Sequence, residues 1–109
     1  NVLLNGPGST GSNIYRLAAT GGAQALARDS GEIAVGKLAD LAALDTDHPA
    51  MCALKPDQLL DGWIFAAPEG VVSDVWSAGR HKVKNGRHVA RDAVVADYRK
   101  AMRDLTLRL

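Results

Sequence analysis

The first third of the chain has apolar positions spaced like one face of a helix. They recur at Ile14, Leu17, Ala18, Gly21, Ala25 and Leu26. This spacing is close to the 3.6-residue period and predicts a helix over residues 14–28. Ser12 is its predicted N-cap, because its hydroxyl can accept a backbone N–H of the first turn, and Gly31 is its predicted stop. Gly21 and Gly22 each cost about 1 kcal/mol inside a helix, so we expect another element to approach the helix closely there.

The middle of the chain shows short apolar stretches typical of strands. Ile33 and Val35 alternate with smaller or polar residues, and an apolar run follows at Leu41–Leu44. With a Gly-Lys turn at 36–37 between them, they predict two short strands. Residues 57–67 then carry apolar side chains on one helical face, at Leu59, Leu60, Trp63, Ile64 and Ala67. We therefore predict an inserted helix near 57–67.

A β-hairpin is predicted by the Asn-Gly pair at 85–86. Both central residues of a type I′ turn need positive φ, and Asn-Gly satisfies this requirement well. A two-residue turn would pair Val83 with His88 and His81 with Ala90. The two histidines would then share one face of the hairpin.

One further element precedes this hairpin and one follows it. Residues 71–76 predict a strand. Residues 92–109 predict a terminal helix with Asp92 as its N-cap. The apolar stripe of that helix consists of Val95, Tyr98, Met102, Leu105 and Leu109.

Composition places the chain among ordinary globular proteins. It has 109 residues, 47% of them hydrophobic and 23% charged, with a net charge of +1. This charge gives no global attraction to nucleic acid or to anionic lipid. Cys52 is the lone cysteine, which favours a reducing, cytoplasmic setting. No apolar run approaches the roughly 20 residues of a membrane span, and no signal peptide is recognised. Because the sequence starts at Asn1 and not at a methionine, we expect a fragment.

The stretch GPGSTG, from Gly6 to Gly11, matches the G-x-G-x-x-G pattern of dinucleotide-binding loops. Such a loop must follow a buried strand and lead to a second strand that carries an acid near its end. Only three apolar residues precede this loop, and Glu32 comes before the next predicted strand. We therefore interpret the glycines as a sharp turn between helices.

No set of side chains points to catalysis or to metal binding within the chain. The histidines are His48, His81 and His88, and a zinc site needs three or four ligands, for which the sequence offers no His-x-His, H-E-x-x-H or Cys pair. Cys52 has no histidine placed by the local sequence to activate it, so a nucleophile role is unsupported. Ser9, Thr10 and Ser12 lack the Gly-x-Ser-x-Gly context of a nucleophile.

A basic cluster lies in and around the hairpin. It comprises Arg80, Lys82, Lys84, Arg87 and Arg91. Stacking aromatic residues are missing and the net charge is near zero, which disfavours a nucleic-acid surface. A solvated face, or an edge guarded against aggregation, is the preferred interpretation.

The stretch GEIAVGKLADLAALD, residues 31–45, resembles the Gly-x-Ile-x-x-Gly-Lys-x-Ala-Asp-Leu-x-x-Leu-Asp signature near the C-terminus of metal-dependent amidohydrolases. The runs NVLLNGPGSTGSNIYRLAATGGAQAL, LLDGWIFA and DVWSAGRHKVKNGRHVARDAV are similar to the C-terminal part of the formimidoylglutamate deiminases of that superfamily. The likeness covers essentially all 109 residues.

The resemblance implies an α+β fragment. Residues 1–30 would hold the last, closing helix of a (β/α)8 TIM barrel. Residues 31–91 would hold the C-terminal strands of a small composite β-sandwich with the helix near 57–67 inserted, and residues 92–109 would form the terminal helix. Apolar faces at 14–28 and 33–44 would lack their partners, so we expect association with a second copy, as a homodimer, or with the missing barrel and N-terminal strands.

The resemblance also implies a parent enzyme that converts N-formimidoyl-L-glutamate and water into N-formyl-L-glutamate and ammonia, in histidine degradation. Its zinc, or another divalent metal, would be bound upstream of Asn1, so we assign no catalytic, substrate-binding or metal-binding residue here and expect the chain alone to be inactive. The alternatives are another amidohydrolase, such as a guanine deaminase or a chlorohydrolase-like aminohydrolase, and a non-enzymatic β-rich interaction domain. Neither nucleic acid nor membrane is an expected partner.

Overall fold

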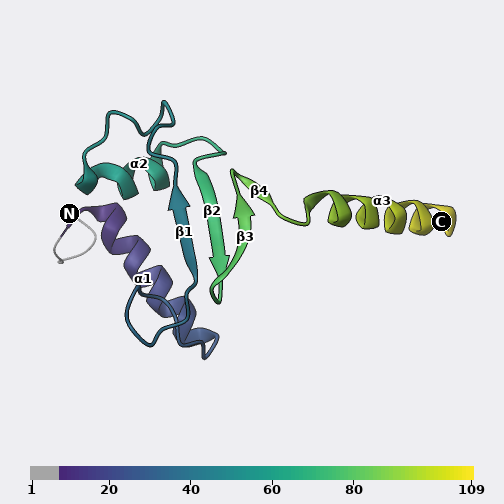
Figure 1. Cartoon of the computed structure of the whole chain (residues 1–109), viewed down its shortest axis with the longest axis horizontal. Helices are drawn as coiled ribbons and strands as arrows, with labels where there is room; N and C mark the ends of the chain where they lie inside the picture. Colours follow the sequence, from purple (N-terminus) through teal and green to yellow (C-terminus); the bar gives the residue numbers. More distant parts are fainter. Residues whose placement is uncertain (1–7) are drawn as a thin grey trace.

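The structure is a computed structural model that describes residues 8–109. Residues 1–7, with the three apolar residues and the start of the glycine motif, lie outside the described part. The described elements run along the chain as α1 (Thr10–Ala25), β1 (Leu41–Leu44), the 3-10 helix η1 (Pro56–Gln58), α2 (Leu59–Phe65), β2 (Val72–Ser77), β3 (Arg80–Lys84), β4 (Arg87–His88) and α3 (Arg91–Leu107) (Figure 1). This mixture agrees with the predicted α+β class.

The four strands form one antiparallel sheet in the order β1-β2-β3-β4. The turn at 85–86 is confirmed, since its Asn and Gly have φ of 49° and 75°, as a type I′ turn requires. Val83 pairs with His88 as predicted. The predicted pairing of His81 with Ala90 is wrong, because β4 ends at His88 and the chain then turns into α3.

The strand predicted around Ile33 and Val35 is absent, and turns and bends take its place. Gly31 and Gly36 flank this segment with φ of 91° and 87°. This left-handed backbone interrupts an extended strand at both ends. Ile33 is 89% exposed and Val35 is fully exposed, so neither side chain gains burial within residues 8–109.

Two helices begin earlier than predicted. Ser9, and not Ser12, is the N-cap of α1, and its hydroxyl accepts the Ser12 backbone N–H at 3.2 Å. This helix ends at Ala25, three residues before the predicted end. In α3, Ala90 occupies the N-cap position and Asp92 lies in the first turn. The helix predicted near 57–67 is confirmed as η1 followed by α2.

The close approach predicted at Gly21 and Gly22 is wrong for the described residues, where a Cβ at either position would meet no atom within 4 Å. Close packing occurs instead at Gly31, where a Cβ would lie 2.8 Å from the Ala19 carbonyl oxygen. The loop after α1 therefore folds back onto the helix at a glycine outside the helix.

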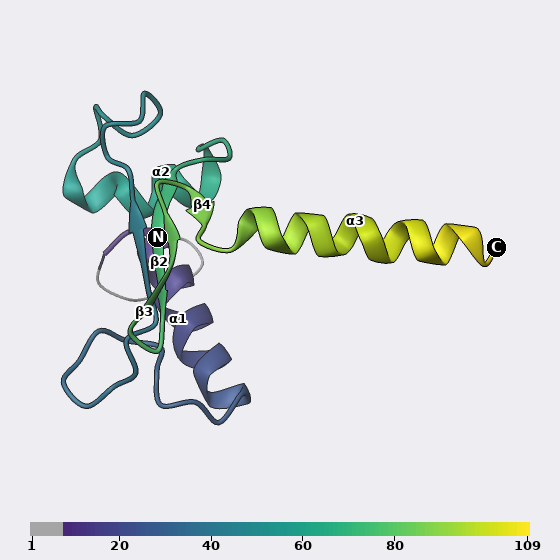
Figure 2. The same ribbon diagram turned by 45° about the vertical axis from the view of Figure 1, so that its right-hand side comes forward.

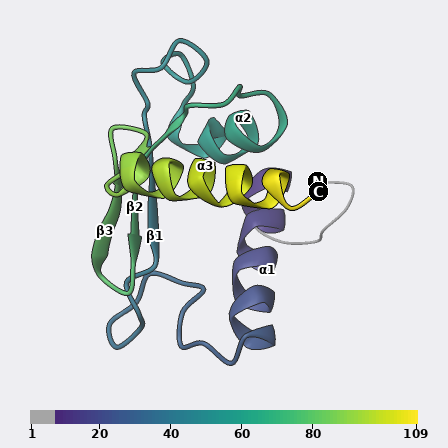
Figure 3. The ribbon, with the colours of Figure 1, turned by 90° about the vertical axis from the view of Figure 1, so that its right-hand side faces the viewer.

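The helices α1 and α2 pack against each other on one side of the sheet (Figure 3). At their contact the rings of Tyr15 and Trp63 lie 5.5 Å apart at a 53° angle, which is a favourable tilted arrangement for aromatic rings. The opposite face of the sheet carries no other element of the described chain (Figure 3).

The core is small, and the molecule is extended. Among residues 8–109 only Met51 and Val71 are buried apolar side chains, each 1% exposed. The radius of gyration is 17.7 Å, whereas a compact domain of this size would have about 13 Å. Much of the difference comes from α3, which projects beyond β4 as a single long helix (Figures 1 and 2). These residues therefore do not enclose a full hydrophobic core of their own.

Candidate functional site

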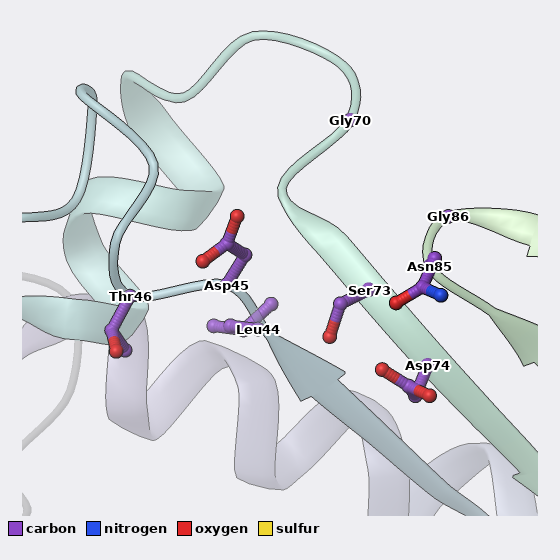
Figure 4. A pocket seen from close by; sticks show the side chains of 8 residues that line it. All are labelled: Leu44, Asp45, Thr46, Gly70, Ser73, Asp74, Asn85 and Gly86. Atoms are coloured by element: carbon purple, nitrogen blue, oxygen red, sulfur yellow. The ribbon is translucent and has the colours of Figure 1, made fainter.

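A polar pocket lies where β1 ends, β2 begins and the β3–β4 turn closes (Figure 4). It has a volume of about 510 Å³ and is lined by Leu44, Asp45, Thr46, Gly70, Ser73, Asp74, Asn85 and Gly86. Its lining combines two carboxylates, two hydroxyls and one amide. None of these residues was singled out as a candidate from the sequence, because the pocket is assembled from three separate segments.

Three side chains of this pocket, those of Asp45, Ser73 and Asp74, have partners within the chain. Asp45 accepts the Asp47 backbone N–H at 3.0 Å. The Asp74 carboxylate lies 2.7 Å from Nε2 of His81. The neighbouring Ser73 hydroxyl, which is the larger cause, and the His81 ring both lower the pKa of Asp74. Because the Ser73 hydroxyl also lies 3.4 Å from the Ala43 carbonyl oxygen, its single proton serves one acceptor at a time.

This arrangement does not form a nucleophilic triad. In a Ser-His-Asp triad the imidazole lies between the hydroxyl and the carboxylate, so that it can take the hydroxyl proton. Here the Asp74 carboxylate lies between Ser73 and His81. The His81 ring also stacks on Trp76, with ring centroids 4.4 Å apart and an angle of 9°. The structure therefore gives His81 a role in holding β2 to β3.

The three histidines lie in separate local environments. Nδ1 of His48 accepts the Ala50 N–H at 3.1 Å, and Nδ1 of His88 accepts the Ala90 N–H at 3.0 Å. In residues 8–109, no three His, Cys, Asp or Glu side chains gather where they could hold a metal ion. The exposed Cys52 lies with its Sγ 3.6 Å from the Pro49 carbonyl oxygen. The described residues therefore do not supply the donor set that zinc requires.

The described end of the glycine motif is used for helix packing. Gly11 lies in the first turn of α1, and its backbone N–H donates to the Asp61 carboxylate at 2.5 Å. A carboxylate at a helix N-terminus is stabilised by the helix dipole. A phosphate bound there would compete with this carboxylate and be repelled by it. The local geometry at Gly11 thus disfavours nucleotide binding, and the turn between helices stays a prediction because residues 1–7 lie outside the described part.

The basic side chains of the hairpin remain largely on the surface. Arg80, Lys84, Arg87 and Arg91 are exposed, and Lys82 is half-buried. Arg87 forms an ion pair with Asp92, at the start of α3. The nearby aromatic residue Trp76 is stacked on a histidine of the sheet. The cluster therefore offers charge without a free stacking surface.

The segment at 31–45 has a clear structural role. Lys37 binds Asp29 at 2.9 Å and lies 3.7 Å from Glu32. Asp40 binds Arg28 through two hydrogen bonds, and it accepts the Ala78 backbone N–H at 2.8 Å. These contacts join the segment after α1 to the turn between β2 and β3. Sequence reasoning could not find the contact between Asp40 and Ala78, because these two residues are distant in the chain.

No helix among residues 8–109 has the length and apolar character needed to cross a membrane. The chain is similar to known proteins along most of its length. A sequence model described as "Amidohydrolase family" matches residues 6–82. Formimidoylglutamate deiminase from Pseudomonas aeruginosa is 43% identical over 82 residues, which are 75% of this chain and 18% of that protein.

A solved structure supports the same relationship. The crystal structure of an amidohydrolase from Brucella melitensis matches with a TM-score of 0.77 and 38% identity, and the match covers 96% of this chain and 23% of that chain. The chain thus spans about a fifth of the length of these relatives. On the evidence of the family match, the sequence identity and the shared fold, this chain belongs to the amidohydrolase family.

Proposed function

We propose that this chain is the C-terminal structural part of an amidohydrolase that cleaves amidine-type C–N bonds. The proposed reaction is N-formimidoyl-L-glutamate and water to N-formyl-L-glutamate and ammonia. The observation that carries the proposal is the 43% identity to formimidoylglutamate deiminase over 75% of the chain. That match spans only 18% of the relative, which supports a part that serves a larger enzyme.

In this reaction water adds to the formimidoyl carbon, the bond from that carbon to the terminal nitrogen breaks, and the nitrogen leaves as ammonia. The oxygen of water remains in the formyl group. Zinc, when bound in the parent enzyme, would supply an activated water. Because the described residues offer no donor set for it, we place its ligands outside this chain and derive no step from residues 8–109.

The part proposed for this chain is to hold two layers of the enzyme together. We propose that α1 is the closing helix of the barrel and that β1 to β4 belong to the small composite sandwich. Asp40 and Arg28 would then fix the barrel helix to the sandwich sheet through the two hydrogen bonds between them. The support is the placement of these contacts, which join the end of α1 to the β2–β3 turn.

A chimeric enzyme tests this role. The matching segment of the Pseudomonas aeruginosa deiminase would be replaced by this chain, and ammonia release from N-formimidoyl-L-glutamate would be measured. If the chain is a structural part, the folded chimera should keep kcat/KM within about tenfold of the parent. The 109-residue chain alone serves as the control and should release no ammonia.

Two results would contradict the proposal. The first is ammonia release by the isolated chain, which would place the catalytic residues within it. The second is a folded chimera, with an unchanged circular dichroism spectrum, that has lost activity altogether. The substrate is tested separately in the complete protein that carries this chain, which should hydrolyse N-formimidoyl-L-glutamate in preference to guanine.

A further inference from the structure

The first turn of α1 is the buried end of this helix. Gly11 and Asn13 are its buried residues, whereas most positions from Tyr15 to Ala25 are exposed within the described part of the chain. The helix α2 lies over this buried end and packs against α1 (Figures 1 and 3). The rest of the described chain therefore fixes the point at which α1 begins more closely than it fixes the remainder of the helix.

The contact between α2 and the start of α1 leaves room only for glycine. The Asp61 carboxylate accepts the Gly11 backbone N–H at 2.5 Å. A Cβ on Gly11 would lie 2.9 Å from both the backbone nitrogen and the Cα of Asp61, so any larger residue would overlap α2. The carboxylate thus reaches the first turn of α1 because the two backbones meet at a residue without a side chain.

The helix that carries Asp61 is itself packed on two segments of the chain. On one side, a Cβ on Gly62 would meet the sulfur of the buried Met51 at 3.8 Å. On the other side, the ring of Trp63 lies 5.5 Å from the ring of Tyr15 in α1. Asp61 therefore offers its carboxylate to Gly11 from a helix that is held in place by these neighbours.

A second set of hydrogen bonds fixes the residue just before α1. The Ser9 carbonyl oxygen accepts the Asn13 backbone N–H at 3.1 Å and the Asn13 side-chain N–H at 3.0 Å. The Asn13 side chain is 1% exposed, and its oxygen accepts a hydrogen bond from Arg16 at 2.7 Å. Asn13 from within the helix and Asp61 from outside it thus act on the same turn.

This end of α1 has a meaning for catalysis if the helix closes the barrel, as proposed above. In a (β/α)8 barrel each helix follows a strand, and the strand-to-helix connections form the face that carries the active site. The first turn of a closing helix therefore lies at the catalytic face, and its last turn lies at the opposite face. The inference that follows rests on the proposed function in this respect.

We propose that Asp61 is a positioning residue for the hydrolytic reaction. It acts through Gly11: its carboxylate holds the first turn of α1, and with it the point where the chain enters the helix from the catalytic face. A displacement of about 1 Å in an active site can slow a reaction on the order of 100-fold. Loss of the Asp61 contact should therefore slow the chemical step, although Asp61 touches no reacting atom.

The test measures ammonia release from N-formimidoyl-L-glutamate by the complete protein that carries this chain. Asp61→Ala removes the acceptor of the Gly11 N–H, and we expect kcat to fall at least about tenfold while KM stays within about twofold. Asp61→Asn keeps an acceptor oxygen in the same place and should retain kcat within about threefold of the unchanged protein. Asp61→Glu keeps the charge but shifts the carboxylate by one methylene group, and it should also lower kcat.

Asp40→Ala is the matched control. It removes a carboxylate that holds the other end of the same helix, through the two hydrogen bonds from Arg28. This variant should lower the midpoint of thermal unfolding but leave kcat and KM within about twofold of the unchanged protein. Circular dichroism checks that each variant is folded, and the assays are run well below the lowest unfolding midpoint. If Asp61→Ala does not fold, Asp61→Glu takes its place.

Hydrogen exchange provides a readout that does not depend on activity. Asp61→Ala should speed exchange in the peptide that contains Gly11, and Asp40→Ala should speed it in the peptide that contains Ala78, whose N–H Asp40 accepts. Unchanged exchange at Gly11 in the folded Asp61→Ala variant would show that the contact does not hold this turn, and would overturn the proposal.

The kinetic outcomes that would overturn the proposal are equally specific. They are an unchanged kcat in the folded Asp61→Ala variant, a rise in KM without a fall in kcat, a loss of kcat in Asp61→Asn as large as in Asp61→Ala, and an equal loss of kcat in Asp40→Ala. An unchanged protein that releases no ammonia would instead contradict the proposed function, and the inference would fall with it. The two failures are therefore distinguished by the activity of the unchanged protein.

Discussion

The Asp40 carboxylate receives two hydrogen bonds from the Arg28 guanidinium, from Nε at 2.6 Å and from Nη2 at 2.9 Å. The planar guanidinium matches the carboxylate in this two-point geometry, which gives direction as well as attraction. The backbone N–H of Ala78 adds a third hydrogen bond at 2.8 Å. One side chain thereby fixes the segment after α1, the start of β1 and the β2–β3 turn relative to one another.

This arrangement predicts a specific pH dependence of stability. The hydrogen bond from Arg28, and then the one from Ala78, hold the pKa of Asp40 well below its usual range. Because the unfolded chain takes up the proton at higher pH than the folded chain, the stabilisation is present above about pH 4 and is lost as the pH falls below it.

Urea unfolding between pH 7 and pH 3 measures this effect. We expect Asp40→Asn to lower the unfolding midpoint at pH 7 and the difference from the unchanged chain to shrink on acidification. Asp74 also has a lowered pKa, but it is present in both proteins and cancels in the comparison. Two curves that run parallel down to pH 3 would contradict the prediction.

Gly31 should be the least replaceable glycine of the loop after α1. Its φ is 91°, and a Cβ would lie 2.8 Å from the Ala19 carbonyl oxygen and 3.0 Å from the Ala23 Cβ. We expect Gly31→Ala to lower the free energy of unfolding by about 1–3 kcal/mol. Gly36→Ala is the matched control, because Gly36 has a similar φ of 87° but no atom within 4 Å. Equal losses for the two variants would show that the close packing has no energetic effect.

The N-cap of α1 can be identified by mutation. Ser9 accepts the backbone N–H of Ser12 through its side chain. We therefore expect Ser9→Ala to lower the free energy of unfolding by about 1 kcal/mol. Ser12→Ala should cost less, since its hydroxyl makes only a side-chain contact with Ser9 at 3.1 Å. If chemical denaturation showed a larger loss of unfolding free energy for Ser12→Ala than for Ser9→Ala, Ser12 would be the N-cap, as predicted from the sequence.

Met51 is the principal buried side chain beneath α2. It is 1% exposed, and a Cβ on Gly62 of α2 would meet its sulfur at 3.8 Å. We expect Met51→Ala to lower the free energy of unfolding by about 2–5 kcal/mol, because it leaves a cavity. The exposed neighbour Cys52 provides the control. Cys52→Ala should change the free energy of unfolding by less than about 0.5 kcal/mol. Similar values for both would mean that this region is not a packed core.

The sequence predicted those elements whose signals are local. The Asn-Gly turn at 85–86 fixed the register of Val83 against His88, since a two-residue loop leaves one pairing. The strand predicted at Ile33 and Val35 is absent. The alternation of apolar and polar side chains does not reveal that the flanking Gly31 and Gly36 adopt positive φ. The N-cap of α1 lies three residues earlier than predicted because Ser9 and Ser12 could both serve, whereas α3 begins after Ala90, which makes no side-chain cap hydrogen bond.

The candidate sites show the same limit. Local patterns were sufficient to question the glycine motif, yet nothing near Gly11 in the sequence points to Asp61 as its partner. The contact between Asp74 and His81 likewise depends on the register of β2 against β3. Family resemblance supplied the signature at 31–45, while the structure supplies the physical reason for its Asp40: it holds two distant segments together.

The order of the strands has a consequence for how this chain folds. Each strand pairs with the next one along the chain, so no strand must be inserted between two that have already formed. Assembly can begin at the tight turn between β3 and β4 and extend to β2 by short-range encounters, which are fast. The addition of β1 must close the long loop that contains α2, so we expect it to be the slowest step of the sheet.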